Sequence, residues 1–431
     1  MAVAPQTALQ QAVTDLMPLA AKIFDEVRSA SRDIEGVTRP AWSVQDQAAG
    51  DILLQVAQQQ GLTTHVDAVG NTYATLPGRD EGAPRVVSGS HLDSVSRGGN
   101  FDGLAGAVAA VIALAALRQA GLVPACSLSA MGTRCEESVW FGIAYVGARL
   151  AVGAMERAEF DALVRLDSGG SIAAHMADLG LEVEAIWRQR PIINAANTKA
   201  FLELHIEQGP LLIERKTPLG IATAIRGNLR YGDAVCRGAY QHSAATPRRL
   251  RQDTVLAVAE LLRRLEDLWH GIEDGDDPSA VFTVGKLFTD PENHALTKVP
   301  GECRFSLNFG STEQDTLDRF DRALAAAADE IAQRRRVHFD LGAAVGSSPT
   351  PLEPNLREAL NASAERLGIP AIPFATVGHD ASVFARAGIP AVVLLVRNGQ
   401  GSHNPHETME MEDFEQGVQV LAATMFDLAE V

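Results

Sequence analysis

Cysteine is scarce in this sequence, and it is not spaced for a metal or redox centre. The four cysteines are scattered and form no CxxC motif. A disulfide framework and a cysteine zinc site are therefore not expected. The pattern agrees with a protein of the reducing cytoplasm. The four residues are Cys126, Cys135, Cys236 and Cys303.

Positive charge is also in short supply. The 431 residues include 37 Lys and Arg against 54 Asp and Glu, which gives a formal net charge of −17. A surface of this sign repels phosphate groups, so neither nucleic acid nor an anionic membrane is expected as a partner.

Long hydrophobic runs are missing as well. The most apolar stretch, Leu104–Leu117, is too short to span a bilayer and predicts a buried helix. Residues 1–16 contain no basic segment followed by an apolar one, so we expect no signal peptide. Both features agree with the cytoplasmic location that the cysteines suggest.

The chain is longer than one hydrophobic core usually supports, which predicts two domains. In its first half, strand-like runs alternate with segments of helical periodicity, the pattern of an α/β sheet with helices on both faces. The expected strands are 85–90, 125–131, 163–166 and 200–205, and the expected helices are 9–29, 43–60, 102–120 and 141–150.

A different pattern begins after about residue 213. Two strands, a helix, two strands and a second helix predict an inserted α+β domain with an antiparallel sheet. Residues 214–329 would form this insertion, and residues 1–213 and 330–431 the first domain. The inserted strands are 218–225, 230–238, 280–287 and 302–309, its helices 251–269 and 313–335, and the chain then returns through strands 336–341 and 391–396 and helices 355–367 and 412–428.

Two adjacent carboxylates, Glu136 and Glu137, follow the predicted strand 125–131. Neighbouring carboxylates repel each other, so a solvated turn is the simplest interpretation. A metal site offers another interpretation, in which one carboxylate binds a cation and the other accepts a proton from water activated there.

His91 and Asp93 end the strand 85–90, and Asp102 begins the next helix. A His-x-Asp pair allows the carboxylate to fix the tautomer of a metal-binding imidazole, although a histidine at a strand end can be purely structural. Asp102 suits a helix cap equally well, but the two glycines shortly before it would let the backbone approach an ion.

Other histidines lie at comparable positions. His205 ends the strand 200–205, and His403 follows the strand 391–396. Either could be a plain surface residue. As ligands, they would complete two catalytic sites of three protein ligands each, with Asp102 shared between them.

Two more histidines have weaker signals. His242, in the predicted insertion, is a loop histidine of a kind that is usually solvated, and its functional interpretation is a donor to the oxyanion of a tetrahedral intermediate. His379 either lies at the same site or simply neighbours a helix N-cap at Asp380.

Six motifs in chain order resemble the amidase/hydantoinase-carbamoylase family, a branch of the dinuclear-metal aminoacylase and carboxypeptidase superfamily. That branch contains N-carbamoyl-L-amino acid hydrolases, β-ureidopropionases and allantoate amidohydrolases. The resemblance covers nearly the whole chain. The motifs are Ser88–Val95, Gly99–Gly103, Glu136-Glu137, Leu204–Pro210, Gly378–Ala381 and Ser402–Glu407.

The resemblance implies a mixed-sheet, exopeptidase-like catalytic domain of the α/β class, interrupted by a dimerisation or lid domain, in a homodimer. It implies two divalent cations, of which Zn²⁺ is expected, although Mn, Co and Ni suit the same ligands. It assigns His91, Asp102 and His205 to one cation, Asp102, Glu137 and His403 to the other, Glu136 to the general base, and His242 to a histidine that reaches across the dimer to the scissile carbonyl.

Four positions depart from the pattern of the family. The resemblance implies an arginine at the positions of Trp140 and Gly310. It implies an asparagine at the positions of Gln241 and Thr297. The last of these arginines would hold a carboxylate of the substrate, and glycine cannot make that bidentate contact. The metal and base positions therefore match, whereas several substrate-selecting positions do not.

We predict an amidohydrolase that cleaves a linear amide or ureido C–N bond through a hydroxide bridging two cations, on a substrate atypical of the family. Arg226, Arg230 or Arg304 could supply the charge that Gly310 lacks, and Asp93 is expected to assist catalysis. Contacts to a small-molecule substrate are expected from Gln208, Gln241, Trp140, Arg230, His379 and Asn308.

Three alternatives stay open: an N-carbamoyl-L-amino acid hydrolase proper, a dipeptidase or aminoacylase-like enzyme, and a non-catalytic metal-binding dimer. Ammonia and carbon dioxide as products would indicate a carbamoyl group, whereas a free acid would indicate an acyl amide. Glu136 argues against the third alternative, because a structural metal site needs no free base beside it.

Overall fold

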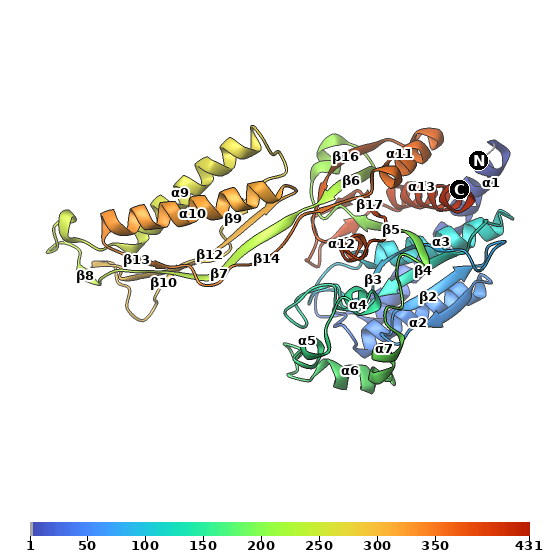
Figure 1. Ribbon diagram of the computed structural model, residues 1–431, viewed down its shortest axis with the longest axis horizontal. Helices are drawn as coiled ribbons and strands as arrows, with labels where there is room; N and C mark the ends of the chain where they lie inside the picture. The colour runs from blue at the N-terminus through green and yellow to red at the C-terminus, as the bar shows by residue number, and fades with distance from the viewer. Residues whose placement is uncertain (1–2) are drawn as a thin grey trace. The chain divides into compact units, whose positions relative to one another are not determined.

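A computed structural model describes residues 3–431 of the chain and divides it into two compact units. The first unit runs to Thr223 and resumes from Leu352 to Val431, and the second comprises Ala224–Pro351. Figure 1 shows the elements of each unit by label. The first unit contains all of the predicted metal ligands.

A mixed sheet forms the centre of the first unit. Its four middle strands are parallel, in the order β4 (Leu128–Thr133), β3 (Arg85–His91), β5 (Thr198–Ile206) and β17 (Ala391–Val396). These strands are almost entirely buried, as parallel strands covered on both faces should be. The flanking strands are β1 (Thr63–Val66), β2 (Thr72–Leu76), β6 (Leu219–Ile225), β15 (Thr350–Pro351) and β16 (Ala371–Thr376).

Helices cover both faces of this sheet, as predicted (Figure 1). One hydrophobic core joins the sheet to α1 (Val3–Ala30), α2 (Val44–Gln59), α3 (Leu104–Gln119), α11 (Pro354–Leu367) and α13 (Met411–Glu430). The opposite face carries α12 (Ala381–Arg386), next to α4 (Val146–Ala151). The remaining elements of this unit are α5 (Arg157–Asp161), α6 (Ile172–Asp178), α7 (Val183–Gln189), α8 (Leu211–Arg215), β18 (Asn398–Gly399) and β19 (Thr408–Met409).

The two-residue period of β5 separates the core from the site. Leu202 and Leu204 belong to the core that contains α3. The alternate residue Phe201 stacks on Phe384 of α12, with ring centroids 3.9 Å apart. Since side chains alternate along a strand, His205 points to the same side as Phe201.

An antiparallel sheet and two helices form the second unit, as predicted for the insertion (Figure 1). Helices α9 (Thr254–Glu273) and α10 (Gln314–Arg335) share one hydrophobic core with the central strands. The strands are β7 (Gly227–Arg237), β9 (Val281–Thr283), β10 (Leu287–Thr289), β12 (Glu302–Ser311), β13 (His338–Asp340) and β14 (Val345–Ser347), with β8 (Gln241–His242), β11 (Lys298–Val299) and the short helix η1 (Arg248–Leu250) beside them.

Two strands belong to a different sheet from the one predicted from the sequence. The strand predicted at 218–225 pairs with β17 in the first sheet, and the strand predicted at 336–341 pairs with β7 in the second. The units therefore divide at 223/224 and 351/352, later in the chain than the sequence boundaries at 213/214 and 329/330. Hydrogen-bonding partners, which composition does not encode, decide the sheet to which a short strand belongs.

Two predicted segments of regular structure are wrong. Residues 163–166 form only a bridge between Val164 and Ser171, and Val164 and Leu166 are exposed rather than buried. The helix expected at 141–150 begins only at Val146, because residues 141–145 form a loop after β4.

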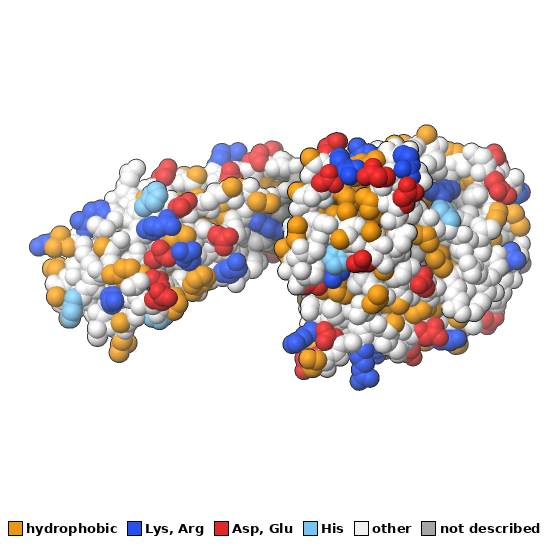
Figure 2. Space-filling view, turned by 90° about the horizontal axis from the view of Figure 1, so that it is seen from below, with side chains coloured by type: hydrophobic (Ala, Val, Ile, Leu, Met, Phe, Trp, Pro, Cys, Tyr) orange, Lys and Arg blue, Asp and Glu red, His pale blue; other side chains and the backbone are white. Residues whose placement is uncertain are grey.

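The surface carries charges of both signs. On the face shown in Figure 2, acidic and basic side chains are interspersed despite the net charge of −17. Among the described residues, no helix combines the length and apolarity needed to cross a bilayer.

A buried ion pair supports the loop that carries Glu136 and Glu137. The Arg134 Nη1 atom lies 2.9 Å from Asp46 Oδ2, and both side chains are almost fully buried. Arg134 Nε also donates to the Gly70 carbonyl oxygen at 2.8 Å. Arg134 thereby anchors the chain directly after β4, at the start of this loop.

We predict that Asp46→Ala lowers the free energy of unfolding by about 3 to 5 kcal/mol, because it leaves the Arg134 guanidinium buried without its counter-charge. Chemical denaturation measures this difference. Asp161→Ala, which breaks the exposed pair with Arg157, is the control and should leave the stability nearly unchanged. Equal effects of the two substitutions would contradict the prediction.

Candidate metal centre

The candidate ligands come from the carboxyl ends of the four parallel strands. His91 is the last residue of β3, and His205 is the penultimate residue of β5. Glu137 follows β4, and His403 follows β17. Because parallel strands end at the same edge of a sheet, these residues meet there, as ligand sites of α/β proteins do.

Asp102 lies at the centre of this group. Its Oδ1 atom is 3.3 Å from His91 Nε2 and 3.2 Å from His205 Nε2, and its Oδ2 atom is 3.3 Å from His403 Nε2. The next residue, Gly103, has a φ of 66°, and a Cβ atom there would lie 2.4 Å from the ring of His91. Glycine is therefore required for Asp102 to approach the imidazoles this closely.

The second ring nitrogen fixes the orientation of two of these histidines. His91 Nδ1 lies 2.9 Å from the backbone oxygen of Asp93, and His205 Nδ1 lies 2.9 Å from that of Ile206. A carbonyl oxygen can only accept, so Nδ1 carries the proton and the lone pair of Nε2 faces Asp102. This tautomer is the one that a metal-binding histidine needs.

Asp93 orders the pair of glutamates. Its carboxylate accepts the backbone N–H groups of Glu136 at 3.0 Å and of Glu137 at 3.2 Å. The sequence predicted that this carboxylate would fix His91, but the Asp93 backbone carbonyl makes the close contact, and the carboxylate is 3.6 Å away. Asp93 therefore sets the direction of the glutamate pair.

The donor atoms fit two divalent cations that share Asp102. Three groups of ligand atoms lie within 4.8 Å of one another: His91 with Asp102 and His205, His91 with both glutamates, and Asp102 with Glu137 and His403. Asp102 Oδ1 and Glu137 Oε1 are buried and accept no hydrogen bond. Buried carboxylate oxygens without a donor are unusual in proteins, and a cation would satisfy both.

The electrostatics of these groups agree with a site built for positive charge. Burial would raise the pKa of Asp102, but the close imidazoles of His205, His403 and His91 hold it well below its usual range. The neighbouring carboxylates of Asp102 and Glu137 raise the pKa of His403 to about 10. Both shifts favour positive charge at the point where cations would bind.

Glu136 differs from its neighbour in its surroundings. The residue as a whole is partly exposed. Its carboxylate nevertheless lies among buried groups, and this burial raises its pKa well above the usual range of a glutamate. His91 opposes this shift, whereas the nearby carboxylates of Glu137 and Asp380 add to it. A carboxylate with raised proton affinity is suited to accept and release a proton near neutral pH.

Two of the predicted substrate-binding residues lie beside the ligands. Gln208 Nε2 donates to Asp102 Oδ2 at 2.9 Å. The His379 ring is 4.5 Å from that of His205, and burial lowers its pKa well below the usual range. Hydrogen-bond partners hold both side chains in place.

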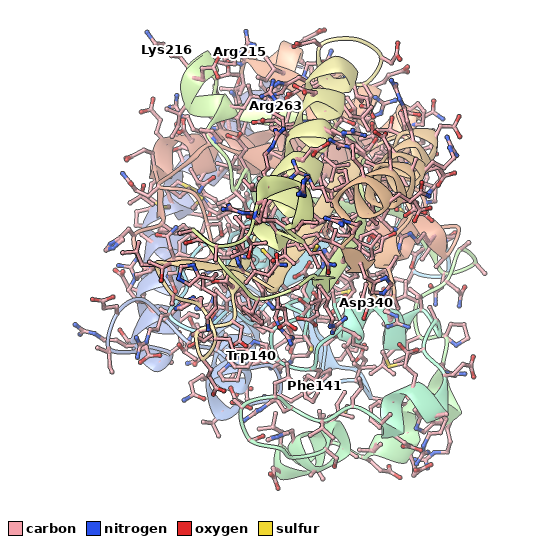
Figure 3. The ribbon with its side chains drawn as sticks, turned by 90° about the vertical axis from the view of Figure 1, so that its left-hand side faces the viewer. Trp140, Phe141, Arg215, Lys216, Arg263 and Asp340 are labelled. Atoms are coloured by element: carbon pink, nitrogen blue, oxygen red, sulfur yellow. The ribbon has the colours of Figure 1, made fainter. Side chains whose placement is uncertain are left out.

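Trp140 has a different position from the predicted one. It follows the glutamate loop next to Phe141 (Figure 3), its side chain is 5% exposed, and its Nε1 donates to the Ser94 oxygen at 3.0 Å. Both aromatic residues belong to a hydrophobic cluster with Trp42. Trp140 therefore packs in the core, and the expectation that it contacts the substrate is corrected.

The second unit contains the other candidates. His242 is exposed, and its Nδ1 accepts the backbone N–H groups of Ala244 and Ala245, both at 3.2 Å. The side chain of Gln241, beside it in β8, binds the backbone of Leu250 and Gln252. His242 thus has its Nδ1 atom occupied and its ring oriented.

Arg230 and Asn308 pair across β7 and β12. They are opposite each other in the strand register, and Arg230 Nε donates to Asn308 Oδ1 at 3.2 Å. Gly310 lies two residues further along β12, on the same face of the strand. A Cβ atom at Gly310 would lie 2.6 Å from Val281 Cγ2, so a side chain there would have to displace Val281.

Three polar residues to which the sequence analysis assigned no catalytic or binding role support the ligands. Glu203 accepts from the Ser90 hydroxyl at 2.7 Å, and Glu407 from the Asp102 backbone N–H at 3.2 Å. Asp380 contacts the Thr133 hydroxyl. A charged residue inside an apolar strand was a visible signal for Glu203, whereas Glu407 was visible only as the last residue of the motif Ser402–Glu407.

Comparison with known proteins places this geometry in a family. Residues 61–427 match the model of peptidase family M20/M25/M40. The chain is 30% identical over 410 residues to an N-carbamoyl-L-amino-acid amidohydrolase of Paenarthrobacter aurescens, covering 94% of this chain and 97% of that protein. It is 29% identical over 371 residues to allantoate amidohydrolase of Escherichia coli, covering 86% and 87%.

A solved structure agrees with both comparisons. An amidase of the hydantoinase/carbamoylase family from Burkholderia multivorans superposes with a TM-score of 0.87 at 27% identity, covering 96% of this chain and 98% of that one. The chain therefore belongs to peptidase family M20/M25/M40, a metal-dependent family, and within it to the amidohydrolases of the hydantoinase/carbamoylase type.

Proposed function

We propose that this amidohydrolase cleaves the C–N bond of a linear amide or ureido group, with Glu136 as its general base. One observation carries the proposal. His91, Asp102 and His205 converge as one set of ligands and Asp102, Glu137 and His403 as another, which leaves Glu136 beside them as a carboxylate that neither set requires.

Each part of the site would have a separate role. The two cations, when bound, would polarise the carbonyl of the substrate and lower the pKa of water. Zn²⁺ suits the mixture of imidazole and carboxylate ligands, as do Mn, Co and Ni. Asp93 holds the backbone of both glutamates, so it keeps the base and the ligand apart.

Glu136 moves the proton in the proposed reaction. Its carboxylate takes a proton from the attacking water as the new C–O bond forms. It then returns this proton to the leaving nitrogen as the C–N bond breaks. His242, which the resemblance assigns to a histidine reaching across the dimer, is proposed to donate to the carbonyl oxygen, on which negative charge develops. Its Nδ1 accepts two backbone N–H groups, so the donor would be Nε2.

The substrate is proposed to differ from those typical of the family. Gly310, with Val281 packed against it, offers no cation for a substrate carboxylate. Arg230, on the same face of the sheet and oriented by Asn308, is the side chain that we propose for this contact. Gln208, His379 and Gln241 would supply further polar contacts. An N-carbamoyl-L-amino acid, which the P. aurescens relative hydrolyses by name, is the second candidate.

We further propose a cytoplasmic homodimer. Leu287, Phe288 and Leu296 of the second unit are large hydrophobic residues with 56%, 48% and 102% relative exposure. Exposed apolar side chains of this size often mark a surface that another chain covers. Sedimentation at several protein concentrations would test the dimer.

We predict that chelation of divalent cations abolishes hydrolysis. Without the cations, Asp102 and the other ligands cannot polarise the carbonyl of the substrate. Zn²⁺, Mn²⁺, Co²⁺ and Ni²⁺ should each be tried for recovery on carbamoyl, formyl, acyl and simple amides, with and without a carboxylate. Ammonia and carbon dioxide as products would identify a ureido substrate, and a free acid an acyl amide. Full activity in the metal-free protein would contradict the metal-dependent mechanism.

We predict that Glu136→Gln lowers kcat roughly 100- to 10,000-fold and changes KM little, because it removes the proton acceptor but no cation ligand. The metal content of the variant should equal that of the wild type. Glu156→Gln, at an exposed glutamate, is the matched control and should keep full activity. Loss of bound metal in Glu136→Gln would instead make this residue a ligand.

We predict that Arg230→Met raises KM roughly 10- to 100-fold for substrates with a carboxylate and leaves uncharged amides unaffected, because a charge-assisted hydrogen bond is lost. Arg304→Met is the matched control on β12. An effect of the control alone would assign the carboxylate contact to Arg304.

A further inference from the structure

The loop that carries His403 has an unusual backbone conformation. The His403 side chain is 52% exposed, and its φ of 58° lies in the left-handed region that residues other than glycine rarely adopt. Gln400 and Gly401 in the same loop also have positive φ values. A loop keeps such a conformation only when its surroundings hold it.

Asn398 and Asn404 hydrogen-bond to the backbone of this loop, and the buried side chain of Glu407 links the loop to the segment of Asp102. Its Oε1 accepts the backbone N–H groups of Phe101 at 2.8 Å and Asp102 at 3.2 Å. Its Oε2 accepts the Ser402 hydroxyl at 2.8 Å, and the same hydroxyl contacts the carboxylate of Asp102. Glu407 therefore joins the segment that carries Asp102 to the segment that carries His403.

The chain leaves space for this carboxylate at Gly99. A Cβ atom there would lie 2.2 Å from both the carboxyl carbon and the Oε1 atom of Glu407. Even alanine at this position would collide with Glu407. The position of the carboxylate thus depends on Gly99, in the segment of Asp102, and on Glu407, in the segment of His403.

We propose that Glu407 is a positioning residue for one of the two cations, the one held by Asp102, Glu137 and His403. The proposal rests on the metal binding in the proposed function. His91 and His205 do not depend on Glu407, because strands β3 and β5 carry them and backbone carbonyls orient their rings. Asp102 belongs to both sites, but only the site of His403 has a second ligand on a segment that Glu407 holds. Loss of Glu407 therefore weakens that site more than the other.

Calorimetric titration of the metal-free protein with Zn²⁺ tests this asymmetry. The wild type is expected to bind two cations per chain. Glu407→Ala is expected to lose roughly 10- to 100-fold in affinity for one cation, the usual effect of removing a residue that supports a ligand, and to lose clearly less for the other.

Two conservative variants show whether the hydrogen bonds of Glu407 or only the space that its side chain fills supports the cation. In Glu407→Gln, the amide oxygen can still accept the two backbone N–H groups and the amide nitrogen can donate to Ser402, so both affinities should be near those of the wild type. Glu407→Asp is one methylene shorter and should behave like Glu407→Ala. If Glu407→Ala does not fold, the contrast between Gln and Asp still decides the question.

Two further variants are matched to these. Gly99→Ala retains Glu407 but places a methyl group where its carboxylate lies, and it should lose affinity mainly for the same cation. Glu410→Ala removes the same charge from an exposed position nearby and should bind both cations normally. Melting temperatures of all variants report their folding independently of metal.

Each remaining outcome has a defined meaning. Unchanged binding of both cations in Glu407→Ala would overturn the proposal, and equal weakening of both would reduce Glu407 to a general structural role. A wild type that binds two cations but hydrolyses no amide would refute the proposed function and leave this inference standing. A wild type that binds only one cation would refute the inference itself.

Discussion

The position of one carboxylate, that of Asp102, governs the organisation of the first unit. Three imidazoles approach it within 3.3 Å, and it is almost fully buried. A buried carboxylate in this position is stable only with positive charge around it, whether on protons or on cations. The parallel strands, the glycine at 103 and the Nδ1 contacts of two histidines all serve to bring lone pairs to this point.

The structure brings together the residues that the sequence analysis grouped, because these residues follow strong local signals. His91, Glu137 and His205 each come at or directly after a buried apolar strand, and parallel strands bring such ends together. The supporting residues were harder to recognise. The role of Asp93 depends on the path of the backbone around it, and that of Glu407 on contacts with a segment about 300 residues earlier in the chain.

The errors in the fold have a related cause. The segment 163–166 has the composition of a strand but finds only a single bridge, and residues 141–145 have helical periodicity but form a loop after β4. Similarly, β6 and β13 were recognised as strands and assigned to the wrong sheets. Local propensity describes what a segment can form, and the available partner strand decides what it does form.

Substrate choice depends on a second set of residues, which obeys different constraints. A metal ligand must be one of a few residue types at a fixed distance, so its identity is visible in the sequence. A carboxylate contact needs only a guanidinium that can reach, and its position can change between strands. At Gly310 the arginine is absent and a side chain would have to displace Val281, while Arg230 stands on the same face with its Nε bound to Asn308. This bond orients the guanidinium, so under the proposed function Gly310, Arg230 and Asn308 would form one coupled change, in which the arginine for a substrate carboxylate stands on β7 instead of β12.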